Sequence, residues 1–139
     1  MKMKKLLSGI KVLDFTQYLA GPSATRILSD LGADVIKIER APGGDLGRQI
    51  HKVQNDQSAL HLAASAGKRS VCIEIQHQKG KEIIYELVRQ TDVVVENYSP
   101  GVMKKHGLDY DSLRRLKEEL IMCSVSGYGQ DGPYSRNTS

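Results

Sequence analysis

A strand, a helix and a second strand follow one another near the start of the chain, and this pattern constrains the fold more than any other sequence feature. Apolar residues over 10–15 predict the first strand, and those over 33–39 predict the second. Between them, Pro22 favours the start of a helix and Gly32 its end. This helix carries one apolar stripe, typical of packing on a core: Ala24, Ile27, Leu28 and Leu31.

The same pattern recurs further along the chain. A strand over 69–75 precedes a helix over 79–90 and a β-branched run over 92–96, of the kind that is buried on both faces of a sheet. We expect this helix to bury Ile83, Ile84, Leu87 and Val88. Because the crossover in such a unit makes its two strands parallel, the sequence predicts an α/β fold, a Rossmann-like parallel sheet with flanking helices.

The remaining segments fit one domain without an internal boundary. We expect a polar loop over 41–57, a helical turn over 59–65 and another turn after Pro100. A helix over 111–118, with Leu113 and Leu116 inward, and a strand over 120–125 complete the prediction. The tail over 127–139 is rich in Gly, Ser, Pro and Asn and reads as a loop. The chain therefore ends in a connection rather than at the end of a helix or strand.

Composition and charge exclude several classes of protein. The chain of 139 residues is 40% hydrophobic and 26% charged, as expected of a folded globule, and has no stretch apolar enough for a signal peptide or membrane span. We therefore expect a soluble, cytoplasmic protein. A net charge of +4, spread along the chain, fits a small anionic ligand better than nucleic acid.

The cysteines and histidines show no metal or redox motif. Cys72 and Cys123 lie far apart in apolar segments, so we expect buried structural thiols. The four histidines are scattered without the spacing that places ligands on one helical face, which makes a metal site improbable.

Ligands of open parallel sheets bind beyond the carboxyl ends of the strands. That rule selects four places: the loop over 16–22, which contains Gly21 and Pro22, then Arg40, then 97–99, and finally 126–128. The first loop lacks the G-x-G-x-x-G fingerprint, and the chain lacks a P-loop, so neither NAD nor nucleoside triphosphates have their usual motif. Gly21-Pro22 is either a tight turn or a phosphate site at a helix start.

Arg40 and Asn97 each allow a functional and a purely structural interpretation. The guanidinium of Arg40 matches the oxygens of a ribose phosphate, but an ion pair with Glu39 or Asp45 would equally account for it. The amide of Asn97 could bind a ligand or cap the following turn. No Ser-His or similar nucleophile pair is recognisable, so the visible chain is typical of a binding platform.

Several motifs together resemble a known family. Seven segments, taken in order, look like the start of class III CoA-transferases. They are 9–15, 20–22, 31–39, Gly44-Asp45, 68–70, 92–98 with Pro100-Gly101, and 124–129 with Gly132-Pro133-Tyr134. This family includes formyl-CoA transferase, carnitine dehydratase and the related acyl-CoA racemases. Each motif alone is weak, but their joint order over nearly the whole chain is specific.

The resemblance implies transfer of CoA between an acyl-CoA and a carboxylic acid through an aspartyl intermediate, with CoA as substrate and no cofactor or metal. By similarity, Leu19 and Ala20 would line the adenosine pocket, and Arg40 would meet the phosphorylated ribose. Ile73 would pack on the nucleotide. Asn97, Tyr98 and Lys105 would hold the pantetheine and phosphates, although other members carry arginine in place of Lys105.

The family pattern also implies what this sequence lacks. The nucleophilic aspartate follows the Gly-Pro-Tyr segment in family members, so we expect it beyond Ser139 and no catalytic residue in this chain. Residues 1–139 would then form the N-terminal part of the CoA-binding large domain, without the second domain and the C-terminal return segment. Family members form interlocked homodimers, which we expect such a fragment not to form. The alternatives are an acyl-CoA racemase, a non-catalytic nucleotide-binding module and one subunit of a split assembly.

Overall fold

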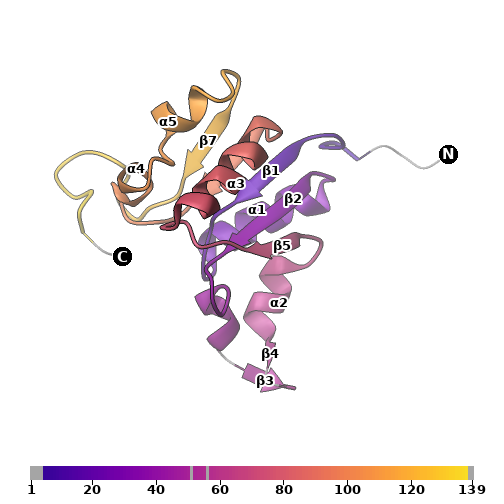
Figure 1. The fold of residues 1–139 in the computed structure, drawn as a ribbon. Helices are drawn as coiled ribbons and strands as arrows, with labels where there is room; N and C mark the ends of the chain where they lie inside the picture. Colours follow the sequence, from indigo (N-terminus) through magenta and orange to yellow (C-terminus); the bar gives the residue numbers. More distant parts are fainter. Residues whose placement is uncertain (1–4, 51, 56, 138–139) are drawn as a thin grey trace.

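The computed structural model describes residues 5–50, 52–55 and 57–137. A sheet of five strands forms its centre, with helices on both faces (Figure 1). The strands of this sheet are β1 (Lys11–Asp14), β2 (Asp34–Glu39), β5 (Arg69–Cys72), β6 (Val93–Glu96) and β7 (Ile121–Ser124). The helices are α1 (Ala20–Asp30), α2 (Ala59–Ser65), α3 (Gln78–Arg89), α4 (Val102–Lys105) and α5 (Tyr110–Arg114).

All neighbouring strands of the large sheet are parallel, in the order β5-β2-β1-β6-β7. The chain moves outward from β1 to β2 and β5, and then crosses back to place β6 on the other side of β1. The strand order therefore reverses between β1 and β6. In open α/β sheets, this is the place where the loops part and a ligand can enter.

Side chains of the central strands alternate between two apolar layers. One layer contains Leu13, Phe15 and Val94 and is covered by α3, α4 and α5, which contribute Ile84, Met103 and Leu113. The other contains Val12, Val35 and Val95 and packs against Leu28 of α1. This burial on both faces explains why the strands of the centre have continuous apolar sequences.

The predicted elements are confirmed, with shifted ends. The helical turn over 59–65 matches α2 (Ala59–Ser65), and the predicted strands and helices all form within a few residues of their expected bounds. The loop over 41–57 contains more structure than expected. It holds a 3₁₀ turn, η1 (Leu46–Gln49), and a small hairpin of β3 (Lys52–Gln54) and β4 (Gln57–Ser58).

The expected apolar stripe of α1 is wrong for three of its four residues: Leu28 packs against the core, but Ala24, Ile27 and Leu31 are exposed. Its buried residues are Gly21, Pro22, Thr25 and Ser29, whereas Ile27 is 60% exposed. Small and hydroxyl-bearing residues face the sheet because two charged side chains lie beneath this helix, as described below. In α3, Ile84 and Val88 are buried as expected, but Ile83 is 52% exposed.

Both cysteines are exposed, so the expectation of buried thiols is also wrong. Cys72 lies on the edge strand β5, all of whose residues are exposed, and Cys123 lies on the other edge strand, β7. Apolar sequence placed these residues in strands correctly, but edge strands bury less surface than central ones.

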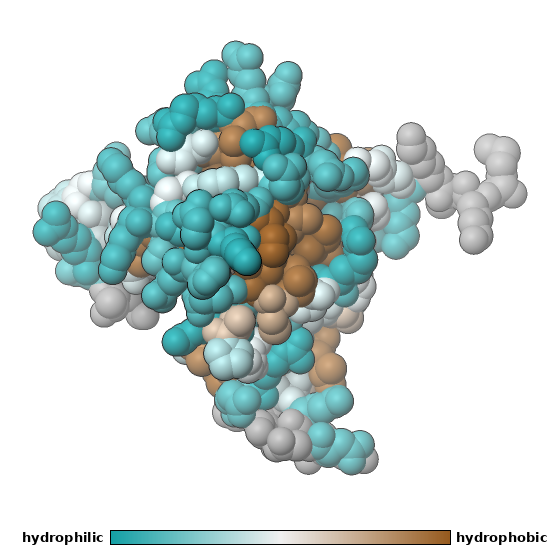
Figure 2. Space-filling model, in the orientation of Figure 1, coloured by the Kyte–Doolittle hydropathy of each residue, from teal (hydrophilic) through white to brown (hydrophobic). Residues whose placement is uncertain are grey.

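Figure 2 shows a brown apolar area near the middle of the face that carries α3.

Candidate functional site

Two loops meet where the strand order reverses, and hydrogen bonds join them. The backbone N–H of Gln17, after β1, donates to Asn97 Oδ1 at 2.7 Å, and Asn97 Nδ2 donates to the carbonyl of Gln17 at 2.9 Å. Gln17 Nε2 also donates to the hydroxyl of Tyr98 at 3.0 Å. Asn97 therefore links two loops as well as following a strand.

A hollow of about 290 Å³ lies on the α3 side of this junction. Its apolar lining comes from Ile38 at the end of β2, from Ile73 and Ile75 after β5, and from Val102 of α4. Arg40, Tyr98 and Gln17 supply its polar groups, together with Glu39, Glu74, Gln76 and His106. A hollow that combines an apolar lining with converging polar groups is typical of a site for a small molecule.

A second hollow, of about 460 Å³, lies on the other side of the junction and shares Tyr98. Its lining is dominated by small residues and loop backbone: Tyr18, Ala20, Asn97, Ser99, Pro100, Val125, Ser126, Gly127, Ser135 and Asn137. The hydroxyl of Ser126 is buried and has no hydrogen-bond partner among the described residues.

Five of the seven binding residues expected from the sequence gather around this junction. Arg40, Ile73 and Tyr98 line the first hollow, and Ala20, Asn97 and again Tyr98 line the second. Ala20 thus lies with Asn97 rather than with Arg40. Leu19, 49% exposed, precedes the first turn of α1 and lines neither hollow, and the same holds for the exposed Lys105 of α4.

The sequence allowed an ion pair between Arg40 and either Glu39 or Asp45, and this interpretation is wrong for both partners. Glu39 instead binds Arg48, with Arg48 Nε 2.7 Å from Glu39 Oε2, and Asp45 binds Lys37, with Lys37 Nζ 2.7 Å from Asp45 Oδ2. Arg40 is exposed at the rim of the first hollow. Neither Glu39 nor Asp45 therefore occupies its guanidinium.

Beneath the junction lie two buried ion pairs that the sequence did not reveal. Lys68 Nζ contacts Asp14 Oδ2 at 2.9 Å and also donates to the carbonyl of Pro22 and the hydroxyl of Thr25. Lys37 pairs with Asp45, and all four side chains are at most 2% exposed. The signal was present, because Lys37 and Glu39 interrupt the apolar residues of β2.

The charged groups near this junction respond to burial and to their partners. Burial by itself would raise the pKa of Glu39, but hydrogen bonds from Arg48, Ser70 and the Asp45 backbone lower it from 4.5 to about 2. Burial lowers the pKa of Lys68, against the pull of Asp14, and raises the pKa of Tyr98. Tyr98 therefore stays a neutral phenol at physiological pH.

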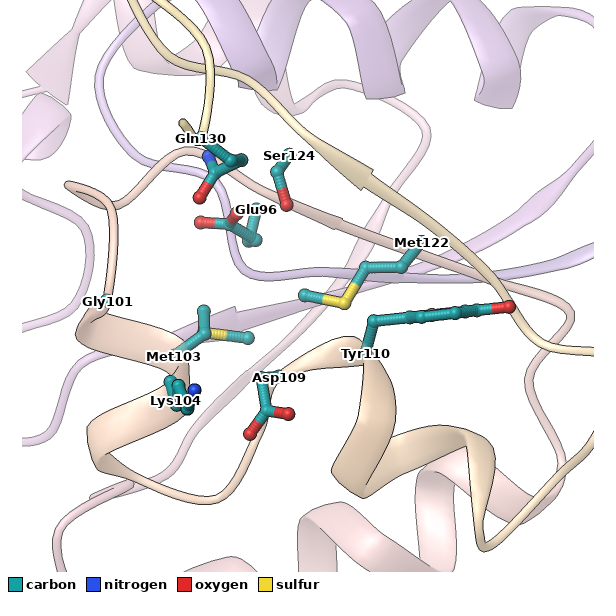
Figure 3. Close-up of a pocket in the computed structure, with 9 residues that line it drawn as sticks. All are labelled: Glu96, Gly101, Met103, Lys104, Asp109, Tyr110, Met122, Ser124 and Gln130. Atoms are coloured by element: carbon teal, nitrogen blue, oxygen red, sulfur yellow. The ribbon is translucent and has the colours of Figure 1, made fainter. Parts of the chain in front are cut away.

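A third hollow, of about 490 Å³, lies under α4 and α5 near the edge strand β7 (Figure 3). Met103 and Met122 point into it, and the carboxyl group of Glu96 lies near Ser124 and Gln130. Burial raises the pKa of Glu96, while hydrogen bonds from Ser124 and the Tyr98 backbone oppose this rise. None of the expected binding residues lines this hollow, so the junction of the two loops is the stronger candidate.

Within the part of the chain that the structure describes, no three His, Cys, Asp or Glu side chains cluster as a metal site would require. The same residues contain no helix with the length and apolar character needed to cross a membrane.

The reversal of strand order and the two hollows beside it define a Rossmann-like ligand-binding domain. The chain belongs to CoA-transferase family III, whose model matches residues 7–139. It is 42% identical to a succinate–glutarate CoA-transferase of Agrobacterium fabrum, over 95% of this chain and 35% of that protein. It is also 42% identical to a formyl-CoA:oxalate CoA-transferase of Streptomyces avermitilis, over 96% of this chain and 32% of that protein.

Solved structures of similar proteins have the same fold. A hypothetical protein from Mycobacterium tuberculosis superposes with a TM-score of 0.89 at 41% identity, over 97% of this chain and 37% of that one. A CAIB/BAIF family protein from Brucella suis gives 0.86 at 39% identity, over 98% of this chain and 37% of that one. The present chain thus spans about a third of the length of the relatives it matches.

Proposed function

We propose that this chain forms the CoA-binding part of a CoA-transferase, which moves CoA from an acyl-CoA to a carboxylic acid. The observation that carries the proposal is the arrangement of Arg40 and the apolar hollow beside it, next to the loop junction at the strand-order reversal. The relatives named above are CoA-transferases for dicarboxylic or formyl and oxalyl groups, which supports the reaction class.

In this proposal, the adenine of CoA packs against Ile73 and its apolar neighbours in the first hollow, while Arg40 binds the 3′-phosphate of the ribose. The guanidinium of arginine offers two parallel donors to phosphate oxygens, which suits this role. The pantetheine arm then passes Tyr98 and Asn97 into the second hollow, where Ala20 leaves room for it. Leu19 and Lys105, which line neither hollow, would contact CoA from the rim.

The transfer itself would proceed by covalent catalysis. A carboxylate nucleophile attacks the thioester carbonyl, which forms a mixed anhydride and releases the CoA thiolate. The thiolate then attacks the carbonyl of the nucleophile, which forms an enzyme thioester and releases the first acid, and the second acid repeats these steps in reverse. We propose that residues 1–139 bind CoA, and the expectation of an aspartate nucleophile beyond Ser139 stays a prediction, as do the interlocked dimer and the cytoplasmic location.

Calorimetric titration of the 139-residue chain with CoA and with 3′-dephospho-CoA tests the proposal. A charge-assisted contact at an exposed site should make CoA bind roughly tenfold more tightly than dephospho-CoA. Arg40→Met should abolish this difference. The matched variant Arg89→Met replaces an arginine at the far end of α3, where it pairs with Glu86, and should keep it.

Two results would contradict the proposal. Absence of CoA binding by the folded chain would remove the proposed function, leaving a non-catalytic module for another ligand. Equal affinity for both ligands would remove the role of Arg40.

A further inference from the structure

The loop between β1 and α1 contains a backbone conformation that needs support. Tyr18 has a φ of 65°, in the left-handed region that side chains other than glycine and asparagine rarely adopt. Residues in such conformations persist when their surroundings hold them, and they concentrate at functional sites. Tyr18 lies in the wall of the second hollow, directly after Gln17 of the loop junction.

Asp45 supplies the support for this residue. Its Oδ1 accepts hydrogen bonds from the backbone N–H of Tyr18 at 3.2 Å and from that of Gly47 at 2.8 Å. The same carboxylate caps the 3₁₀ turn η1, so one oxygen ties this turn to the β1–α1 loop. A methyl group on Gly47 would lie 3.5 Å from the carbonyl oxygen of Tyr18, which shows how closely the two backbones approach.

Lys37 keeps this carboxylate in place. Its Nζ lies 2.7 Å from Asp45 Oδ2 and also donates to the backbone carbonyl of Thr16. The Asp45 backbone N–H donates to Glu39 Oε2 at 2.8 Å, which fixes the main chain at the same point. Asp45 Oδ2 thus has the Lys37 ammonium in ion-pair contact but accepts no hydrogen bond, while Oδ1 accepts two. The side chain cannot rotate away without leaving these two backbone N–H groups unpaired.

Stability alone does not account for this arrangement. A buried ion pair costs desolvation of both charges, and its replacement by uncharged groups of similar volume is often neutral or stabilising. What an apolar pair could not provide here is an acceptor for the Tyr18 N–H. Compared with an apolar residue, Asp45 thus adds a hydrogen bond that orients a loop at the candidate site.

We propose that Asp45 is a positioning residue for ligand binding: it holds Tyr18 in the left-handed conformation and thereby sets the shape of the β1–α1 loop beside the CoA site. This role rests on the proposed function for the identity of the ligand. Lys37 acts through Asp45 by balancing its charge.

A pair of double variants separates the acceptor from the charge. Lys37→Met with Asp45→Asn removes both charges but keeps an acceptor oxygen, so the affinity for CoA should stay within about twofold of the wild-type value. Lys37→Met with Asp45→Ala removes the acceptor as well, and the affinity should fall roughly five- to tenfold, as expected for one lost hydrogen bond. Circular dichroism verifies that each variant is folded.

Hydrogen exchange at the Tyr18 amide provides a readout that does not depend on the ligand. This amide should exchange faster in the Ala variant than in the Asn variant, because only the latter keeps its acceptor. If the Ala variant fails to fold, Asp45→Ser in the same background replaces it, since serine also caps a helical turn but is shorter than aspartate or asparagine.

The outcomes distinguish this inference from the proposed function. Equal CoA affinity of folded Ala and Asn variants overturns the positioning role and leaves CoA binding intact. If the wild-type chain binds no CoA, the proposed function fails, and the hydrogen-exchange rates alone decide the role of Asp45. Equal exchange rates of the Tyr18 amide in both variants would then overturn that role.

Discussion

Gln17 and Asn97 exchange two hydrogen bonds although they are 80 positions apart in the sequence. The bonds join the loop after β1 to the loop after β6, and each uses the backbone of Gln17 and the side chain of Asn97. A side-chain amide carries a donor and an acceptor on two separate atoms, so it can form both bonds at once. The junction therefore depends on asparagine at this position.

Replacement of Asn97 should loosen the junction. Asn97→Ala leaves the N–H and the carbonyl of Gln17 without these partners, so the free energy of unfolding should fall by about 1–3 kcal/mol. Asn97→Asp keeps the acceptor and loses the donor, and its effect should be intermediate. Urea denaturation measures both, with Gln90→Ala, at the exposed end of α3, as a control that should stay within about 0.5 kcal/mol. Equal stability of all three variants would show that the two loops do not depend on Asn97.

The stability of the protein should depend on Glu39 at acid pH. Its pKa in the folded chain is about 2, below its ordinary value of 4.5, so its contribution is fully present above pH 4.5 and is lost as the pH falls toward 2. The difference between the two pKa values corresponds to roughly 3 kcal/mol of the free energy of unfolding.

The measurement compares wild type with Glu39→Gln by denaturation between pH 6 and pH 2.5, and the stability difference between them should shrink as the pH falls. Glu118→Gln, at an exposed position, should leave the wild-type profile unchanged. A constant difference between wild type and Glu39→Gln across this range would contradict the low pKa.

Gly80 is required by a close approach between α3 and the segment before it. Alanine is favoured over glycine in a helix by about 1 kcal/mol. A methyl group on Gly80, however, would lie 2.1 Å from the carbonyl oxygen of Glu74 and 3.2 Å from Ile73 Cγ2. Because the backbone of Glu74 cannot move aside as a side chain can, the cost of overpacking should exceed the gain in helix propensity.

Gly80→Ala should therefore lower the free energy of unfolding by roughly 1–3 kcal/mol. It should also weaken CoA binding, because it displaces Ile73 in the first hollow. Thermal denaturation and calorimetry check the two effects. Lys79→Ala, at the exposed neighbouring position, should change neither, and a stabilised Gly80→Ala variant would show that helix propensity prevails.

The strands and helices of the fold were predictable because central strands of a parallel sheet are buried on both faces. Val93, Val94 and Val95 carry this signal in its clearest form, and their strand lies at the centre as expected. The inner face of α1 was not predictable from apolar spacing. There Asp14, at the end of β1, and Lys68, just before β5, lie against the helix, so Thr25 rather than Ile27 faces inward.

The residues of the candidate site that directly follow strands could be predicted from the sequence, because the strand ends could be predicted. Arg40 and Asn97 directly follow β2 and β6, and the parallel order brings both to one edge. Gln17, Lys37 and Asp45 lie in segments that the sequence singled out, but their individual roles were missed, because these roles depend on contacts between segments that the sequence does not show to be adjacent. A lysine within an isoleucine-rich strand was the one available signal.

The central position of β1 has a consequence for the synthesis of the chain. This strand is made before the other strands of the sheet, yet residues Val12–Asp14 pair on one side with Val93–Val95, about eighty residues later. At usual translation rates, that interval is on the order of ten seconds. The nascent chain must keep an apolar strand with an open edge during this time, and an open edge can pair with another chain.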